Sequence, residues 1–165
     1  MDFYEHTNNW FKGELFEGSI ILISGITILV LSFLTWKIGT TPNAKSFAVV
    51  LLIVGLVFSG ISFGFQANKK RMLTFEKQYN ENPVTFIQQE KERVEGFQWM
   101  YKMSAIISGA FFALTFIAFM FSENRIILSL ALGFMLIGSS LILIDYFSKE
   151  RAAIYYQEIL KEQAK

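Results

Sequence analysis

The chain has no cysteine, which excludes disulfide bonds and thiol chemistry. It has a single histidine, His6, and a metal site would need more partners than the nearby Asp2 and Glu5. We therefore predict that His6 is a surface residue. No serine stands in a recognisable nucleophile–base pattern, and no glycine-rich phosphate loop occurs. The sequence therefore predicts a protein that is not an enzyme and that holds no metal and no cofactor.

Charge is missing from four long stretches, which contain no Asp, Glu, Lys, Arg or His: residues 18–36, 46–68, 103–122 and 126–144. Each stretch is about as long as one helical crossing of a bilayer. A core helix of a soluble protein seldom loses its polar face for so long. The chain is also 53% hydrophobic, with 18 Phe. We predict an all-α membrane protein, a four-transmembrane-helix bundle in contact with the lipid bilayer.

Residues 1–17 are acidic and aromatic, with Phe3, Trp10 and Phe11 at helical spacing. This pattern predicts an interfacial segment that leads into the first span. Trp10 and Trp36 stand on either side of that span, as membrane-interface anchors do. The segment has no basic leader, so we expect the span to be retained rather than cleaved.

Residues 69–102 are polar and predict a cytoplasmic helical hairpin that extends the second and third spans. Its break should fall at residues 80–83, because Asn82 can cap a helix and Pro83 suits a first helical position. Residues 145–165 predict a further amphipathic helix. The basic residues that directly follow the second span should anchor it at the interface: Lys69, Lys70 and Arg71.

The densest charge cluster lies in the second arm of this hairpin and contains Glu90, Glu92, Arg93 and Glu95. Glu90 and Arg93 are three residues apart, within pairing reach on a helix. A solvated helix face explains the cluster without catalysis.

The distribution of basic residues predicts the orientation. Twelve Lys and Arg lie in the amino-terminal, central and carboxy-terminal segments, and three lie in the two short loops around residues 37–45 and 123–125. The positive-inside rule then places both termini in the cytoplasm. Frequent Ile, Lys, Asn and Phe are typical of a bacterium with an AT-rich genome, so we expect the bacterial cytoplasmic (inner) membrane. The net charge of +1 indicates no nucleic-acid partner.

Small residues mark the second and fourth spans, and in lipid such residues let helices pack closely. One face of the second span holds Gly55, Ser59 and Ser62, and the roughly opposite face holds Gly60 and Gly64. The corresponding small residues of the fourth span are Gly133 and Gly138. Two close-packing faces allow contacts both within the chain and with another subunit, and the sequence leaves open whether the second face is used inside the chain.

The two halves of the chain resemble each other. Residues 23–25 and residues 107–109 both read Ile-Ser-Gly. Basic residues follow both even-numbered spans in the same pattern: Lys69 and Arg71, then Lys149 and Arg151. A duplication would give parallel repeats about an axis along the membrane normal, although unrelated membrane hairpins can share such patterns.

No ionisable residue lies deep in a span, which argues against an ion-coupled transporter. The sequence favours a small non-enzymatic membrane protein that acts by assembly, with copies of itself or with a protein partner at its cytoplasmic helices. One alternative is a homo-oligomeric pore or membrane-disrupting effector. Another is an immunity protein or an accessory subunit of a membrane complex.

The predicted orientation can be tested with reporter fusions at Ala44 and Tyr79. We expect the two reporters to lie on opposite sides of the membrane, with Tyr79 in the cytoplasm, because the basic residues gather on that side. Activity that places both reporters on one side would contradict four crossings.

Overall fold

The computed structural model describes residues 3–164, with the side chains of residues 4, 66–68 and 73 left aside. Four helices make up nearly all of this part of the chain: α1 (Phe3–Ile38), α2 (Pro42–Glu81), α3 (Pro83–Phe121) and α4 (Arg125–Gln163). Each is long and apolar enough to cross a membrane. The prediction of an all-α chain with four potential spans is confirmed.

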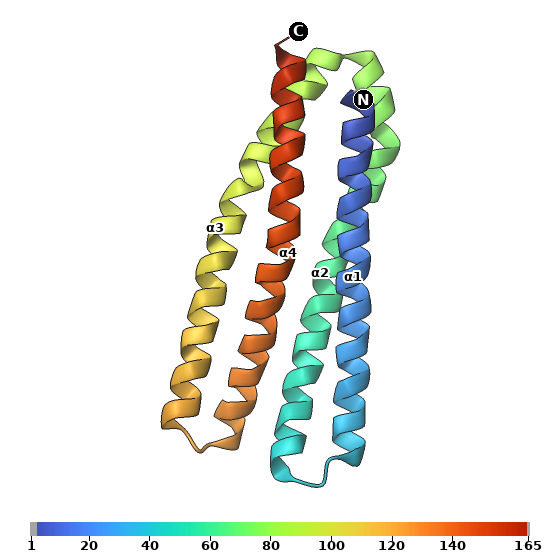
Figure 1. Cartoon of the computed structure of the whole chain (residues 1–165). Coiled ribbons are helices and arrows are strands. Elements are labelled where there is room, and N and C mark those ends of the chain that lie inside the picture. Colours follow the sequence, from blue (N-terminus) through green and yellow to red (C-terminus); the bar gives the residue numbers. More distant parts are fainter. Residues whose placement is uncertain (1–2, 165) are drawn as a thin grey trace.

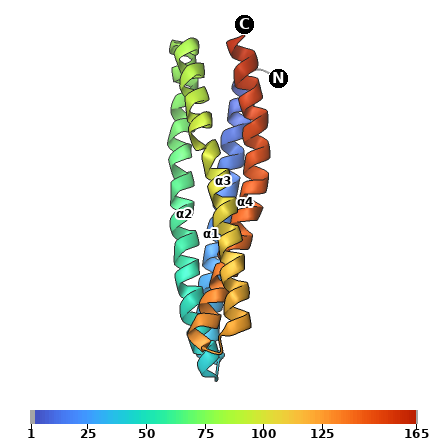
Figure 2. The ribbon, with the colours of Figure 1, turned by 90° about the vertical axis from the view of Figure 1, so that its left-hand side faces the viewer.

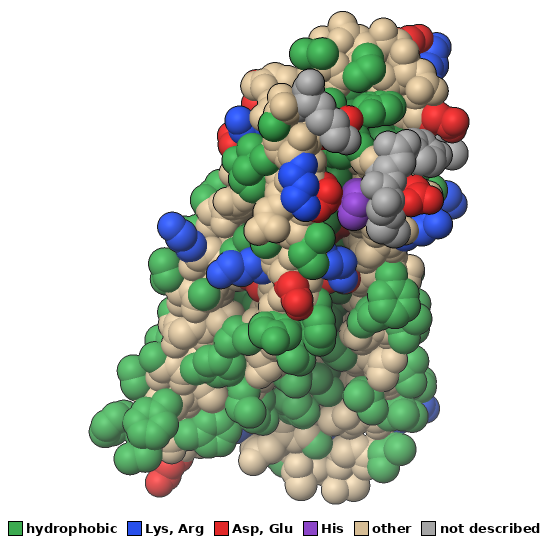
Figure 3. Space-filling view, turned by 45° about the horizontal axis from the view of Figure 1, so that its top comes forward, with side chains coloured by type: hydrophobic (Ala, Val, Ile, Leu, Met, Phe, Trp, Pro, Cys, Tyr) green, Lys and Arg blue, Asp and Glu red, His purple; other side chains and the backbone are tan. Residues whose placement is uncertain are grey.

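The helices contain 36 to 40 residues each. At about 1.5 Å per residue they are roughly 54 to 60 Å long, about twice the thickness of a bilayer core. Figures 1 and 2 show them side by side, with both termini and the α2–α3 turn at one end. Charged side chains gather at this end, and the surface beyond it is mainly apolar (Figure 3). We call this end the crown and define it as residues 3–17, 69–102 and 145–163.

The turn between α2 and α3 is a single residue, because α2 ends at Glu81 and α3 begins at Pro83. The side chain of Asn82 accepts a hydrogen bond from the backbone nitrogen of Thr85 at 3.1 Å. The predicted break, cap and first helical position are thus confirmed. Capping side chains also begin the helices that follow the two loops at the opposite end: Thr41 before α2 and Asn124 before α4.

The first hairpin, α1–α2, is held by a close approach of the two backbones. A Cβ atom on Gly25 would lie 2.8 Å from the backbone nitrogen of Ser59 and 3.1 Å from the carbonyl oxygen of Gly55. Nearer the loop, the hydroxyl of Ser32 donates to the carbonyl oxygen of Ala48 at 2.7 Å. Small residues thus permit both the contact and an interhelical hydrogen bond within the apolar segment.

The second hairpin, α3–α4, repeats the interhelical hydrogen bond, with a looser approach of the two backbones. The hydroxyl of Thr115 donates to the carbonyl oxygen of Ala131 at 2.9 Å. A Cβ atom on Gly138 would lie 3.5 Å from the carbonyl oxygen of Ser108. Each of these residues is 83 positions after its counterpart in the first hairpin. The same interhelical hydrogen bond at the same position in both halves supports an internal repeat.

The structural register differs by one position from the sequence match between residues 23–25 and 107–109, which are 84 positions apart. The counterpart of Gly25 in the packing is Ser108, because Ser108 is the residue that meets the glycine of the partner helix. The spacing shortens to 80 positions in the crown, where Lys69 corresponds to Lys149. The α4 helix is therefore three residues shorter than α2 between the apolar segment and the crown.

The two halves meet where α2 contacts α4. A Cβ atom on Gly133 would lie 2.5 Å from the side chain of Val50, and these two residues are themselves counterparts. Counterparts can touch each other only at an axis of approximate two-fold symmetry. Because α2 and α4 run in the same direction, this axis runs along the helices (Figure 1).

Replacing Gly25 by leucine should force α1 and α2 apart, because the atoms in the way include the backbone of Ser59 and Gly55. We expect Gly25→Leu to cost about 1 to 3 kcal/mol of unfolding free energy, seen as a lower Tm in mild detergent. Gly109→Leu is the matched control, because no atom lies within 4 Å of a Cβ placed there. Equal losses for the two variants would contradict the close approach.

Candidate functional site

The crown has an aromatic core to which all four helices contribute. Its largest rings include Trp10 of α1, Phe86 of α3 and Tyr155 of α4. The Trp10 ring stacks on Tyr155, with centroids 5.4 Å apart, and on Phe97, with centroids 5.9 Å apart. Phe3, Trp10 and Phe11 therefore pack into this core, which differs from the expected placement of that segment on the membrane surface. The reason is that rings from three other helices offer a closer apolar partner.

The residues predicted as interface anchors occupy different environments. Trp10 is only 3% exposed and lies inside the crown, whereas Trp36 is 51% exposed at the opposite end of the molecule. The amine of Lys45 lies 5.1 Å from the centroid of the Trp36 ring, a cation–π distance. The basic residues after the apolar part of α2 are all exposed: Lys69, Lys70 and Arg71.

A buried ion pair lies among the aromatic side chains of this core. Glu90 is only 3% exposed. Its two carboxylate oxygens accept from Nε of Arg93 at 3.0 and 3.1 Å, and Nη2 of Arg93 lies 2.6 Å from Oε2. Nη2 of Arg71, from α2, lies 3.5 Å from Oε1. The prediction that this charge cluster forms a solvated face is wrong for Glu90. The sequence pattern could have predicted this burial, because Glu90 lies at helical spacing between Ile87 and Val94, on the apolar stripe of α3.

Tyr155 and Thr7 extend the network to α4 and α1. The hydroxyl of Tyr155 lies 3.1 Å from Oε2 of Glu90 and 3.2 Å from Oγ1 of Thr7, and can donate its one proton to either. Both residues were missing from the predicted site. Only tertiary contacts join them, because 148 positions separate them along the chain.

The surroundings raise the pKa of two groups in this network, Tyr155 and Arg93. Burial and the charge of Glu90 raise the pKa of Tyr155, so the phenol stays neutral. For Arg93, burial acts against the charged form, but the hydrogen bonds and charge of Glu90 outweigh it and raise the pKa. Both groups lie outside the charge-free segments. The guanidinium of Arg93 is therefore charged and the phenol of Tyr155 neutral at neutral pH.

Arg93 is enclosed by aromatic rings. Its Cζ atom lies 5.6 Å from the ring centroid of Phe97, 5.7 Å from that of Phe11 and 6.0 Å from that of Trp10. Rings in this position stabilise a cation while shielding it from water. The network therefore joins the four helices of the crown.

Some of the predicted packing residues contact another helix of the chain, and others do not. In the first hairpin, Gly55 and Ser59 face α1, and Ser62 is buried and donates to the carbonyl oxygen of Ser59 at 2.7 Å. In contrast, no atom lies within 4 Å of a Cβ placed on Gly60 or Gly64. The small residues of the fourth span are also used within the chain: Gly133 against α2 and Gly138 against α3.

Comparisons with protein families, with curated proteins and with solved structures find no match.

The buried ion pair should respond asymmetrically to mutation. Glu90→Ala leaves Arg93 charged and unpaired among aromatic rings, and we expect it to cost about 3 to 5 kcal/mol in equilibrium unfolding. Replacing both members with apolar residues, as Glu90→Leu with Arg93→Met, should recover most of that loss. Glu92→Ala serves as the control because Glu92 is exposed on the same helix. A double variant as unstable as Glu90→Ala would show that the pair itself stabilises the crown.

Proposed function

We propose that this chain is a non-enzymatic integral membrane protein that works by assembly, through a helix face that its own fold leaves unused. The observation that carries the proposal is the open environment of Gly60 and Gly64 on α2. Ile53, Leu56 and Val57 precede them on the same face and are largely exposed. Small residues one turn apart, flanked by apolar side chains, let a second helix approach closely in lipid.

The internal packing supports this assignment by elimination. Gly55 and Ser59 serve the α1–α2 contact, while Val50 and Val54 face α4 across Gly133. The face with Gly60 and Gly64 is directed to neither helix. The ion pair and the aromatic core would hold α2 in position while this face meets a second copy of the chain.

The twelve-to-three distribution of basic residues favours a cytoplasmic crown in a bacterial inner membrane. In that orientation the exposed tip of the crown is open to a protein partner. Val84, which directly follows the turn between α2 and α3, is 78% exposed and is available for such a contact.

Gly60→Leu and Gly64→Leu test the proposal. For each variant, the native mass in detergent reports assembly and the Tm reports folding. Each should shift the native mass in detergent towards the monomer, because separating the helices removes about 1 to 2 kcal/mol at each interface. The Tm of the monomer should stay unchanged, because neither position has an internal neighbour. Gly109→Leu, at an open glycine of α3, should leave the mass unchanged.

A wild-type protein that is monomeric at all concentrations in several mild detergents would overturn self-assembly. Stable co-purification with a different protein would instead favour an accessory role. Ion flux through reconstituted liposomes would favour a pore.

A further inference from the structure

A cavity of about 640 Å³ lies between α3 and α4, where the apolar segments meet the crown. Its lining includes Lys102 and Asp145, the residues that directly border the charge-free segments of the two helices. In a membrane, this level corresponds to the lipid headgroups. The cavity does not belong to the ion-pair network or to the open face of α2.

Two facing stripes form the cavity. Lys102 and Ala105 lie on one side of α3, and Ile142, Asp145 and Lys149 follow one another at helical spacing on α4. Small side chains leave the space between the helices unfilled, among them Ser104, Ala152 and Ala153. On the crown side, the hydroxyls of Tyr101 and Ser148 lie 3.2 Å apart and join the helices.

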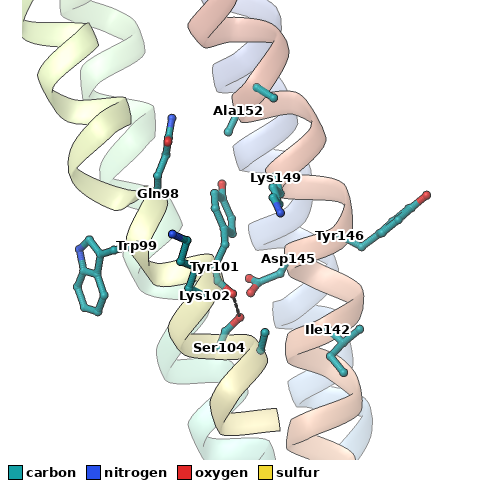
Figure 4. Close-up of a pocket in the computed structure, with 12 residues that line it drawn as sticks. Gln98, Trp99, Tyr101, Lys102, Ser104, Ile142, Asp145, Tyr146, Lys149 and Ala152 are labelled. Atoms are coloured by element: carbon teal, nitrogen blue, oxygen red, sulfur yellow. Dashed lines mark hydrogen bonds between the residues drawn. The ribbon is translucent and has the colours of Figure 1, made fainter. Parts of the chain in front are cut away.

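The charges of the cavity have a definite pattern. Lys102 and Lys149 bring one positive charge from each helix, and Asp145 brings a negative charge from α4. Oδ2 of Asp145 is shielded from solvent and has no hydrogen-bond partner within the described part of the chain. Figure 4 shows Asp145 directing its carboxylate from α4 towards α3, with Trp99 and Tyr146 turned outward on opposite sides.

At this level of the other half of the repeat, the two helices approach each other closely. Phe65, on α2 just before the crown, lies against α1 at Gly18. A Cβ atom on Gly18 would lie 2.5 Å from Cβ of Phe65. Lys69, the counterpart of Lys149, is present, so the two halves keep the basic residue but differ in the cavity.

We propose that this cavity binds the headgroup of a phosphatidylethanolamine-type phospholipid, with the phosphate between Lys102 and Lys149 and the headgroup amine at Asp145. A phosphate diester carries the negative charge that two lysines attract at a membrane surface. A primary ammonium supplies donors to the unpartnered carboxylate. Ala105 and Ile142 continue the lining towards the apolar segment, where acyl chains lie, and outward-facing Trp99 and Tyr146 suit the interface. The proposal requires insertion in a membrane but not self-assembly.

Native mass spectrometry of the detergent-solubilised full chain can test the site. Phosphatidylethanolamine, phosphatidylcholine and phosphatidylglycerol with identical acyl chains are titrated separately. We expect the ethanolamine lipid to bind best, and Lys102→Ala and Lys149→Ala each to weaken it roughly fivefold. Asp145→Asn should remove the preference for ethanolamine over choline. Lys69→Ala is the matched control, because it removes the same charge from the corresponding position of the other half, and it should leave binding unchanged.

Three results would overturn the proposal. Equal losses for Lys69→Ala and Lys149→Ala would show non-specific attraction to surface charge. A preference for the glycerol lipid that Asp145→Asn does not alter would exclude an amine at Asp145. Displacement of the lipid by soluble phosphoethanolamine at a similar concentration would show that the cavity takes a free phosphate compound. The two lysine variants keep the test decisive if Asp145→Asn fails to fold, because both lysines are exposed.

Discussion

The length of the helices relative to a bilayer is the constraint on which the rest of the structure depends. Helices of roughly 54 to 60 Å cannot lie wholly within a hydrocarbon layer of about 30 Å, so each must be stable in two surroundings. In lipid, an apolar side chain gains no free energy by moving from hydrocarbon to the surface of another helix. Helix association there relies on close packing and interhelical hydrogen bonds. In water, burial of aromatic surface stabilises association directly. The chain shows both modes: Gly25, Ser32 and Thr115 in the apolar segments, and Trp10 with Tyr155 in the crown.

The two hairpins of the internal repeat share the same interhelical hydrogen bond. Ser32 and Thr115 donate the same hydrogen bond to Ala48 and Ala131, and the halves meet at counterparts across the symmetry axis. The symmetry then breaks where the apolar segments end. One half places Phe65 against Gly18 at this level and the other leaves a charged cavity. A repeat provides the scaffold, and departures from it are where the halves can acquire separate roles.

Charged and polar side chains inside the crown join its four helices. Glu90 and Arg93 compensate each other in a water-poor site, while Tyr155 and Thr7 connect the pair to the two terminal helices. Such a network stabilises one arrangement of four helices because a shifted helix would leave a buried charge unpaired. The same network joins α2, which carries the open face, to α4, which forms one wall of the cavity.

Local physics was enough for the sequence to determine four apolar helices and the turn at Asn82. A run without charge and a cap followed by proline act over a few neighbouring residues. The tertiary structure alone decided which face of each helix is used. It turned Gly55 inward and left Gly60 open, although both are small residues on one helix. It also buried Glu90 and set the register of the repeat, because both depend on contacts between residues far apart in the chain. Periodicity places residues on a common face, but only the partner helix determines whether that face meets lipid, water or protein.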